Sequence, residues 1–134
     1  MGLSSNKIVA IIQARMGSTR LPGKVLMKIQ GKPMLWHIIN RIKQCDIVDD
    51  IIIATSDSKS DDLIYEMSKE YDISCFRGSE NDVLNRFYNA AEHNNADYII
   101  RVTGDCPLID SNILGDLIRY FFKNGFDHCG IACG

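Results

Sequence analysis

The sequence IVAIIQARMGSTRLPGK, residues 8–24, decides the fold of this chain. Its first half is apolar and β-branched, which predicts a buried strand over Lys7–Gln13. The second half is a loop with two glycines, one proline, two hydroxyls and three cations, which are Arg15, Arg20 and Lys24. Because ligands of open α/β sheets bind at the carboxyl ends of the strands, a basic loop in this position predicts an anion site.

The composition of the loop indicates which anion it would bind. Three like charges on a short loop repel one another unless something negative lies among them. Gly17 and Gly23 allow positive φ and close approach, so backbone amides can also point inward, and a polyphosphate fits such a cradle. The loop is not a P-loop, because five residues separate the glycines and Val25 stands where that motif has Ser or Thr. The alternative is a solvated basic loop, but its place directly after a buried strand favours the cradle.

The amino-acid composition limits which classes of protein this chain can belong to. With 134 residues, 46% of them hydrophobic and 24% charged, the chain is expected to form one nucleotide-binding domain over residues 1–134. A net charge of −2 gives no indication of general nucleic-acid binding. Residues 1–6 are polar and no apolar run reaches membrane-spanning length, so we expect a cytoplasmic protein without membrane contact. Five cysteines without a secretory signal indicate reduced thiols.

The hydrophobic pattern alternates between strands and helices along the rest of the chain. Three further strands are predicted over Asp50–Thr55, Ile73–Phe76 and Asp97–Thr103, and a helical pattern follows each of them. Val25–Ile29 is predicted to form a short extended piece that ends in a turn at Gln30-Gly31. Four strand-then-helix units with short connections predict a Rossmann-like, doubly wound α/β fold: a mostly parallel sheet with helices on both faces.

Each predicted helix is expected to bury one apolar face. The helix after Pro33 is predicted to bury Met34, Leu35, Ile38, Ile39 and Ile42. The second is predicted to bury Leu63, Ile64, Met67 and Tyr71, and the third Val83, Leu84, Phe87, Tyr88 and Ala91. The last helix, capped by Asp110 or Ser111, is predicted to bury Ile113, Leu114, Leu117, Ile118, Phe121 and Phe122.

The acidic loop at residues 56–62 has two interpretations. Ser60 is a plausible N-cap for the second helix, with Asp61 and Asp62 in the first turn, where negative charge is favourable. Its carboxylates also suggest a metal site. Capping explains them adequately, so we predict the cap.

Strand order predicts where the basic loop points. In the doubly wound order 3-2-1-4 the first and fourth strands are neighbours, so the loop after Gln13 faces Gly104-Asp105. The Asp105 carboxylate is then either a salt-bridge partner for the cations or a ligand for Mg²⁺, which one or two carboxylates and substrate phosphates commonly hold. Cys106 follows, but no His lies near it in sequence, so a small buried residue is favoured over a nucleophile.

The turn Gly78–Asp82 follows the third strand and lies at the same edge of the sheet. Its simplest interpretation is a capping box, with Ser79 as the cap and Asp82 close to the N3 position. The same side chains can hydrogen-bond a nucleoside. We rank capping first and base contact as an added role.

Two motifs resemble those of a known family. A-R-x-x-S-x-R-L-P-G-K, residues 14–24, is similar to the opening motif of the sugar-acid cytidylyltransferases, which include the acylneuraminate and 3-deoxy-manno-octulosonate enzymes. Gln13 and Val25-Leu26 are most similar to the spore coat polysaccharide biosynthesis protein F branch. G-D-C-P-L, residues 104–108, is similar to the family's Gly-Asp-Glu-Pro-Leu segment, with Cys106 in place of Glu.

The resemblance implies a nucleotide-diphospho-sugar transferase fold and a set of site residues. The implied CTP-binding residues are Ala14, Arg15, Ser18, Arg20, Lys24, Ser79 and Asp82. Arg15, Arg20 and Lys24 would bind the phosphates, and Asp105 would hold the catalytic Mg²⁺. The implied catalytic residues are Arg15, Lys24 and Asp105.

The predicted reaction is the attack of a sugar or sugar-acid hydroxyl on the α-phosphate of CTP, with release of pyrophosphate, for cell-surface polysaccharide biosynthesis. The motifs run from Ile8 to about Asp110, whereas relatives continue well beyond. The Gly- and Cys-rich residues 126–134 are therefore interpreted as the end of a truncated chain, which is expected to self-associate or dimerise. Two alternatives are a non-catalytic nucleotide-binding module and a nicotinamide-dependent oxidoreductase. The absence of G-x-G-x-x-G counts against the second.

Overall fold

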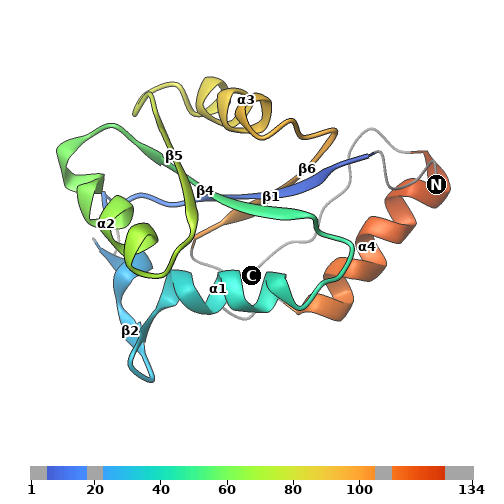
Figure 1. The fold of residues 1–134 in the computed structure, drawn as a ribbon, viewed down its shortest axis with the longest axis horizontal. Helices are drawn as coiled ribbons and strands as arrows, with labels where there is room; N and C mark the ends of the chain where they lie inside the picture. The colour runs from blue at the N-terminus through green and yellow to red at the C-terminus, as the bar shows by residue number, and fades with distance from the viewer. Residues whose placement is uncertain (1–5, 18–22, 105–109, 126–134) are drawn as a thin grey trace.

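A four-stranded parallel sheet forms the centre of the computed structural model, which describes residues 6–17, 23–104 and 110–125 (Figure 1). The strands lie in the order β5-β4-β1-β6. Their bounds are Ile8–Gln13 for β1, Asp50–Ser56 for β4, Ser74–Gly78 for β5 and Tyr98–Thr103 for β6. Numbered along the chain, this is the predicted order 3-2-1-4, and the predicted doubly wound fold is confirmed.

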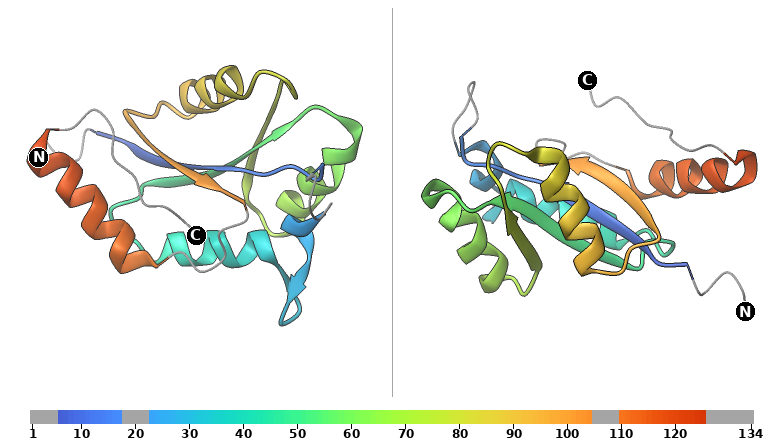
Figure 2. Two further views of the ribbon diagram at one scale, coloured as in Figure 1. Left: turned by 180° about the vertical axis from the view of Figure 1, so that it is seen from behind. Right: turned by 90° about the horizontal axis from the view of Figure 1, so that it is seen from above.

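Four helices cover the two faces of the sheet: α1 (Met34–Lys43), α2 (Asp62–Glu70), α3 (Val83–His93) and α4 (Ser111–Asn124). α3 lies on one face, while α1, α2 and α4 lie on the other (Figures 1 and 2). The larger core is packed between the sheet and α1, α2 and α4, and a smaller one lies under α3. Among the described residues, no helix is both long enough and apolar enough to cross a membrane.

A short β-hairpin connects the basic loop to α1. It joins β2 (Lys28–Ile29) to β3 (Lys32–Pro33), after a 3-10 turn (η2, Lys24–Leu26). Gln30 and Gly31 have φ values of 53° and 83°, which are typical of a tight hairpin turn. The predicted turn is confirmed, but the predicted extended piece is shorter than Val25–Ile29, because Val25 and Leu26 lie in the 3-10 turn. All five residues of the predicted α1 stripe are buried.

The predicted inward face of α3 is wrong by part of a turn. Leu84 is 81% exposed and Tyr88 is also exposed, whereas Arg86 and Ala90 are buried. The predicted face consisted only of apolar residues and did not include Arg86. In the structure the guanidinium lies inside, and the buried face follows the i, i+3, i+4 spacing around it.

The predicted N-cap of α2 is wrong, whereas the predicted N-cap of α4 is confirmed. Ser60 does not cap α2, because it lies within the 3-10 turn Lys59–Asp61 (η3). Asp110 does cap α4, since its carboxylate accepts the N–H groups of Asn112 and Ile113 at 2.7 and 3.2 Å. Three residues of the predicted inward faces of these two helices are exposed: Leu63, Ile113 and Phe122.

Candidate functional site

The ends of β1 and β6 lie in direct contact at the carboxyl edge of the sheet. Gln13 of β1 pairs with Thr103 of β6. A Cβ on Gly104 would lie 2.9 Å from the carbonyl oxygen of Gln13, so only glycine fits there without a shift. The predicted juxtaposition of the basic loop and Gly104 is confirmed, while the predicted site residues Asp105, Ser18 and Arg20 lie outside the described residues.

Hydrogen bonds close the basic loop at its base. Ala14 is buried, and its N–H donates to the carbonyl oxygen of Ala54 at 3.2 Å. Across the loop, the N–H of Gly23 donates to the carbonyl oxygen of Met16 at 2.9 Å, with Gly23 at φ 76°. Positive φ favours glycine at this position. The segments that carry Arg15 and Lys24 are thereby held together at the end of β1.

Arg15 faces a carboxylate from the loop that follows β5. Its Nη2 lies 4.0 Å from Oε1 of Glu80, and both side chains are partly exposed. An ion pair of this length in contact with water contributes little, so it is a weak competitor for a phosphate. The guanidinium of Arg15 is therefore accessible to an anionic ligand.

Ser79 and Asp82 shape the start of α3. The hydroxyl of Ser79 accepts the N–H of Asp82 at 3.2 Å, and the carboxylate of Asp82 accepts the N–H of Asn85 at 3.0 Å. The residue that caps α3 is thus Asp82 and not Ser79, which corrects the predicted capping box. Contact of either residue with a nucleoside stays a prediction.

Asp61 was predicted only as part of a helix start, yet it contacts the basic loop. Its side chain is 2% exposed, and its Oδ1 accepts the N–H of Met16, in the basic loop, at 2.7 Å. The hydroxyl of Ser56 donates to Oδ2. A charged side chain beside a helix start is usually a cap, and nothing local distinguishes this one from a cap.

Arg86 is the second site residue that sequence reasoning missed. Its side chain has no exposed surface, and its Nη1 donates to the carbonyl oxygen of Ser79 at 2.9 Å. Nε and Nη2 have no hydrogen-bond partner in the described part of the chain. Burial lowers the pKa of the Arg86 guanidinium, as does the positive charge of Arg15, while Asp61 and Glu80 act in the opposite direction.

Arg77, a residue of β5, connects that strand to the end of β4, to the loop after β4 and to the first residue of α2. Its Nε and Nη2 donate to the carbonyl oxygens of Ser56 and Ser58 at 3.0 and 2.9 Å. Its Nη1 lies 2.8 Å from a carboxylate oxygen of Asp62. This carboxylate at the first residue of α2 therefore forms an ion pair with Arg77.

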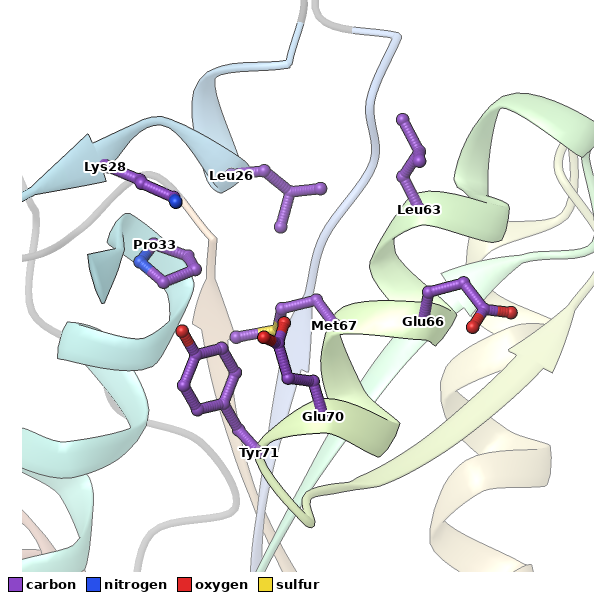
Figure 3. A pocket seen from close by; sticks show the side chains of 8 residues that line it. All are labelled: Leu26, Lys28, Pro33, Leu63, Glu66, Met67, Glu70 and Tyr71. Atoms are coloured by element: carbon purple, nitrogen blue, oxygen red, sulfur yellow. The ribbon is translucent and has the colours of Figure 1, made fainter. Parts of the chain in front are cut away.

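A separate hollow lies between the hairpin and α2 (Figure 3). It has a volume of about 450 Å³ and is lined by Leu26, Lys28, Pro33, Leu63, Glu66, Met67, Glu70 and Tyr71. Neither Arg15 nor Lys24 contributes to it, so it is distinct from the basic loop. Within residues 6–17, 23–104 and 110–125, no three His, Cys, Asp or Glu side chains form a metal-binding group.

Comparison with known proteins identifies relatives along nearly the whole chain. Residues 9–132 match the model of a family described as Cytidylyltransferase. Spore coat polysaccharide biosynthesis protein SpsF of Bacillus subtilis is 41% identical over 127 residues, which are 92% of this chain and 53% of that protein. The chain spans about half the length of the curated relatives it matches.

Two solved structures are also similar to this chain. A cytidylyltransferase from Leptospira borgpetersenii has a TM-score of 0.83 and 41% identity, with 89% of this chain and 50% of that chain covered. A CMP:2-keto-3-deoxy-manno-octonic acid synthetase, solved with CTP, has a TM-score of 0.78 and 28% identity over 90% of this chain and 49% of that one.

Proposed function

This chain belongs to the cytidylyltransferase family, and on that premise we propose that it binds CTP and takes part in the transfer of CMP to a sugar or sugar acid. One observation supports this assignment above the others. The basic loop is closed at its base by the hydrogen bond between Gly23 and Met16, beside the tightly packed Gly104. The base of the first motif and Gly104, the first residue of the second, therefore lie together at the carboxyl edge of one sheet, where ligands of such folds bind.

The proposed reaction is an in-line substitution at phosphorus. A sugar hydroxyl forms a bond to the α-phosphate of CTP, the bond from that phosphorus to the bridging oxygen breaks, and pyrophosphate leaves with the electron pair. The hydroxyl proton passes to solvent. Arg15, Arg20 and Lys24 bind the phosphates and stabilise the charge that accumulates on the leaving pyrophosphate.

The loops around the phosphates bind the rest of the nucleotide. Ala14 and Ser18 contribute contacts from the basic loop, and Ser79 and Asp82 contact the base and ribose from the start of α3. Ser79 is already oriented, because its hydroxyl accepts the N–H of Asp82 and its carbonyl oxygen accepts a hydrogen bond from Arg86. This part of the proposal rests on the placement of the turn at the same sheet edge as the basic loop.

The chemistry of the donors fits a divalent cation such as Mg²⁺ at Asp105. Mg²⁺ is typically held by one or two carboxylates together with substrate phosphates, so Asp105 and the phosphates would share an ion. Gly104, which precedes Asp105 in the sequence, lies against the carbonyl oxygen of Gln13 at the start of the basic loop. When bound, the ion would polarise the α-phosphate.

The family relatives suggest the acceptor and the setting. SpsF acts by its name in spore coat polysaccharide biosynthesis, and the synthetase solved with CTP is named for a sugar acid. We therefore propose a sugar or sugar acid as acceptor, polysaccharide biosynthesis as the setting and the cytoplasm as the location. Family membership favours this chemistry over a nicotinamide-dependent oxidoreductase.

Calorimetric titration with CTP, UTP, GTP and ATP, each with and without Mg²⁺, tests the proposal. CTP is expected to bind most tightly. A pyrophosphate-release assay with a panel of sugars and sugar acids then separates an enzyme from a nucleotide-binding module. Equal affinity for all four nucleotides would contradict CTP specificity.

A further inference from the structure

We propose that Asp61 is a positioning residue, which fixes the basic loop in its ligand-binding shape through the N–H of Met16. The inference rests on the proposed function, because it concerns the loop that binds the triphosphate. Asp61 precedes α2, but its carboxylate turns away from that helix and makes no capping hydrogen bond to it. Instead it reaches a backbone amide 45 residues earlier in the chain.

The hydrogen bonds fix the backbone on both sides of Arg15. Met16 gives its N–H to Asp61 and its carbonyl oxygen to the N–H of Gly23, so neither group is offered to a ligand. On the other side, Ala14 donates to Ala54 in β4. Arg15 is therefore a partly exposed cation between two immobilised residues, which lowers the entropy that it loses when it binds an anion.

Hydrogen bonds and a nearby positive charge compensate the buried carboxylate of Asp61. A buried carboxylate is costly unless hydrogen bonds and opposite charge compensate it. The N–H of Met16 and the hydroxyl of Ser56 each occupy one oxygen. Ser56 also accepts the N–H of Ser58 at 3.2 Å, and the charges of Asp61 and Arg86 attract each other. Both oxygens of Asp61 are thus used inside the protein, and the side chain is 2% exposed.

Substitutions of Asp61 separate the hydrogen bond from the charge. Asp61→Asn keeps an acceptor for Met16 and can donate to Ser56, whereas Asp61→Ala removes both interactions. Asp57→Asn is the matched control, because Asp57 is an exposed carboxylate in the same loop. Amide hydrogen exchange of Met16, with the buried Ile11 of β1 as internal reference, measures the strength of the hydrogen bond between Met16 and Asp61 without any ligand. Calorimetric titration with CTP reports its effect on binding.

Asp61→Ala is expected to speed Met16 exchange and to weaken CTP binding, each about tenfold, because it removes a hydrogen bond to a charged group. Asp61→Asn and Asp57→Asn are expected to stay within about threefold of the unmodified chain. Met16 exchange that rises no more than that of Ile11 would overturn the proposal. An Asp61→Asn variant as impaired as Asp61→Ala would also overturn it, because the charge and not the hydrogen bond would then be responsible.

A second variant covers the case in which Asp61→Ala fails to fold. Ser56→Ala leaves the bond to Met16 but removes the donor to the other oxygen, so a rise of about threefold in Met16 exchange is expected. No rise would contradict the proposal. If the unmodified chain does not bind CTP, the proposed function fails while Met16 exchange still decides the role of Asp61.

Discussion

The N–H of Gly104, at the end of β6, donates to the carbonyl oxygen of Gln13, at the end of β1, at 2.8 Å. This bond continues the β1–β6 ladder by one residue beyond Thr103. It also brings Gly104 against Gln13 and Ala14 at the start of the basic loop. A side chain at Gly104 would have to displace backbone, and this constraint leads to the first prediction.

Gly104→Ala is expected to destabilise the fold by about 1–3 kcal/mol, the usual cost of overpacking. The new Cβ would lie 2.9 Å from the oxygen of Gln13 and 3.1 Å from Cγ1 of Val25. Urea unfolding measures the change. Gly115→Ala is the control, since this glycine lies in α4, where a Cβ would lie 3.3 Å from the flexible end of Arg119 and 3.7 Å from Sγ of Cys45, and it should stabilise by about 0.5–1 kcal/mol. Equal stability of the two variants would contradict the tight contact.

Arg15→Ala, Arg20→Ala and Lys24→Ala should each weaken CTP binding by about 1.5–3 kcal/mol, the range for hydrogen bonds to charged groups. Calorimetry of each variant measures the loss. Lys43→Ala, an exposed cation in the last turn of α1, should bind CTP normally. Unchanged affinity for CTP in all three loop variants would show that the basic loop does not bind the nucleotide.

Asp105→Asn should reduce the Mg²⁺-dependent part of CTP binding and leave metal-free binding intact or slightly tighter, because a carboxylate repels phosphates unless a cation lies between them. Titrations with and without Mg²⁺ separate the two parts. If both fall together, Asp105 has a structural role and the metal assignment is wrong.

Arg86→Met should weaken CTP binding and change stability little. Within the described residues, Nε and Nη2 of the buried guanidinium have no hydrogen-bond partner, which is costly, but its charge also attracts the buried carboxylate of Asp61. These two effects oppose each other, so an apolar side chain should change the free energy of unfolding by no more than about 1 kcal/mol. CTP binding should weaken by about 1 kcal/mol or more, because the cation near Arg15 and the bond to Ser79 are lost. Arg119→Met, on an exposed part of α4, should change neither. A loss of stability without a loss of affinity would make Arg86 purely structural.

The chain should self-associate through β6. Among the described residues β6 pairs only with β1, so its other edge has unpaired backbone groups beside the exposed Ile99. Light scattering should show a mass that rises with concentration, and Ile99→Lys should lower it. Leu63→Lys, at an exposed position on α2, is the control. A monomer at every concentration would contradict the prediction.

The sequence by itself determined the sheet and the first helix. Strands and α1 follow from local periodicity: an apolar run predicts a buried strand, and the stripe from Met34 to Ile42 predicts which face of α1 is buried. The strand order followed because few topologies are compatible with four short strand-then-helix units. The basic loop could also be predicted from the sequence, because its charges and glycines lie close together along the chain.

Only the tertiary structure decided the roles of Asp61 and Arg86. The sequence pattern placed Asp61 in the first turn of α2 and left Arg86 out of the apolar face of α3. In the structure, the buried carboxylate of Asp61 has a partner in the N–H of Met16, and the buried guanidinium of Arg86 has one in the carbonyl oxygen of Ser79. Burial of a charge depends on partners that folding brings together from elsewhere in the chain, and periodicity within one helix carries no information about them.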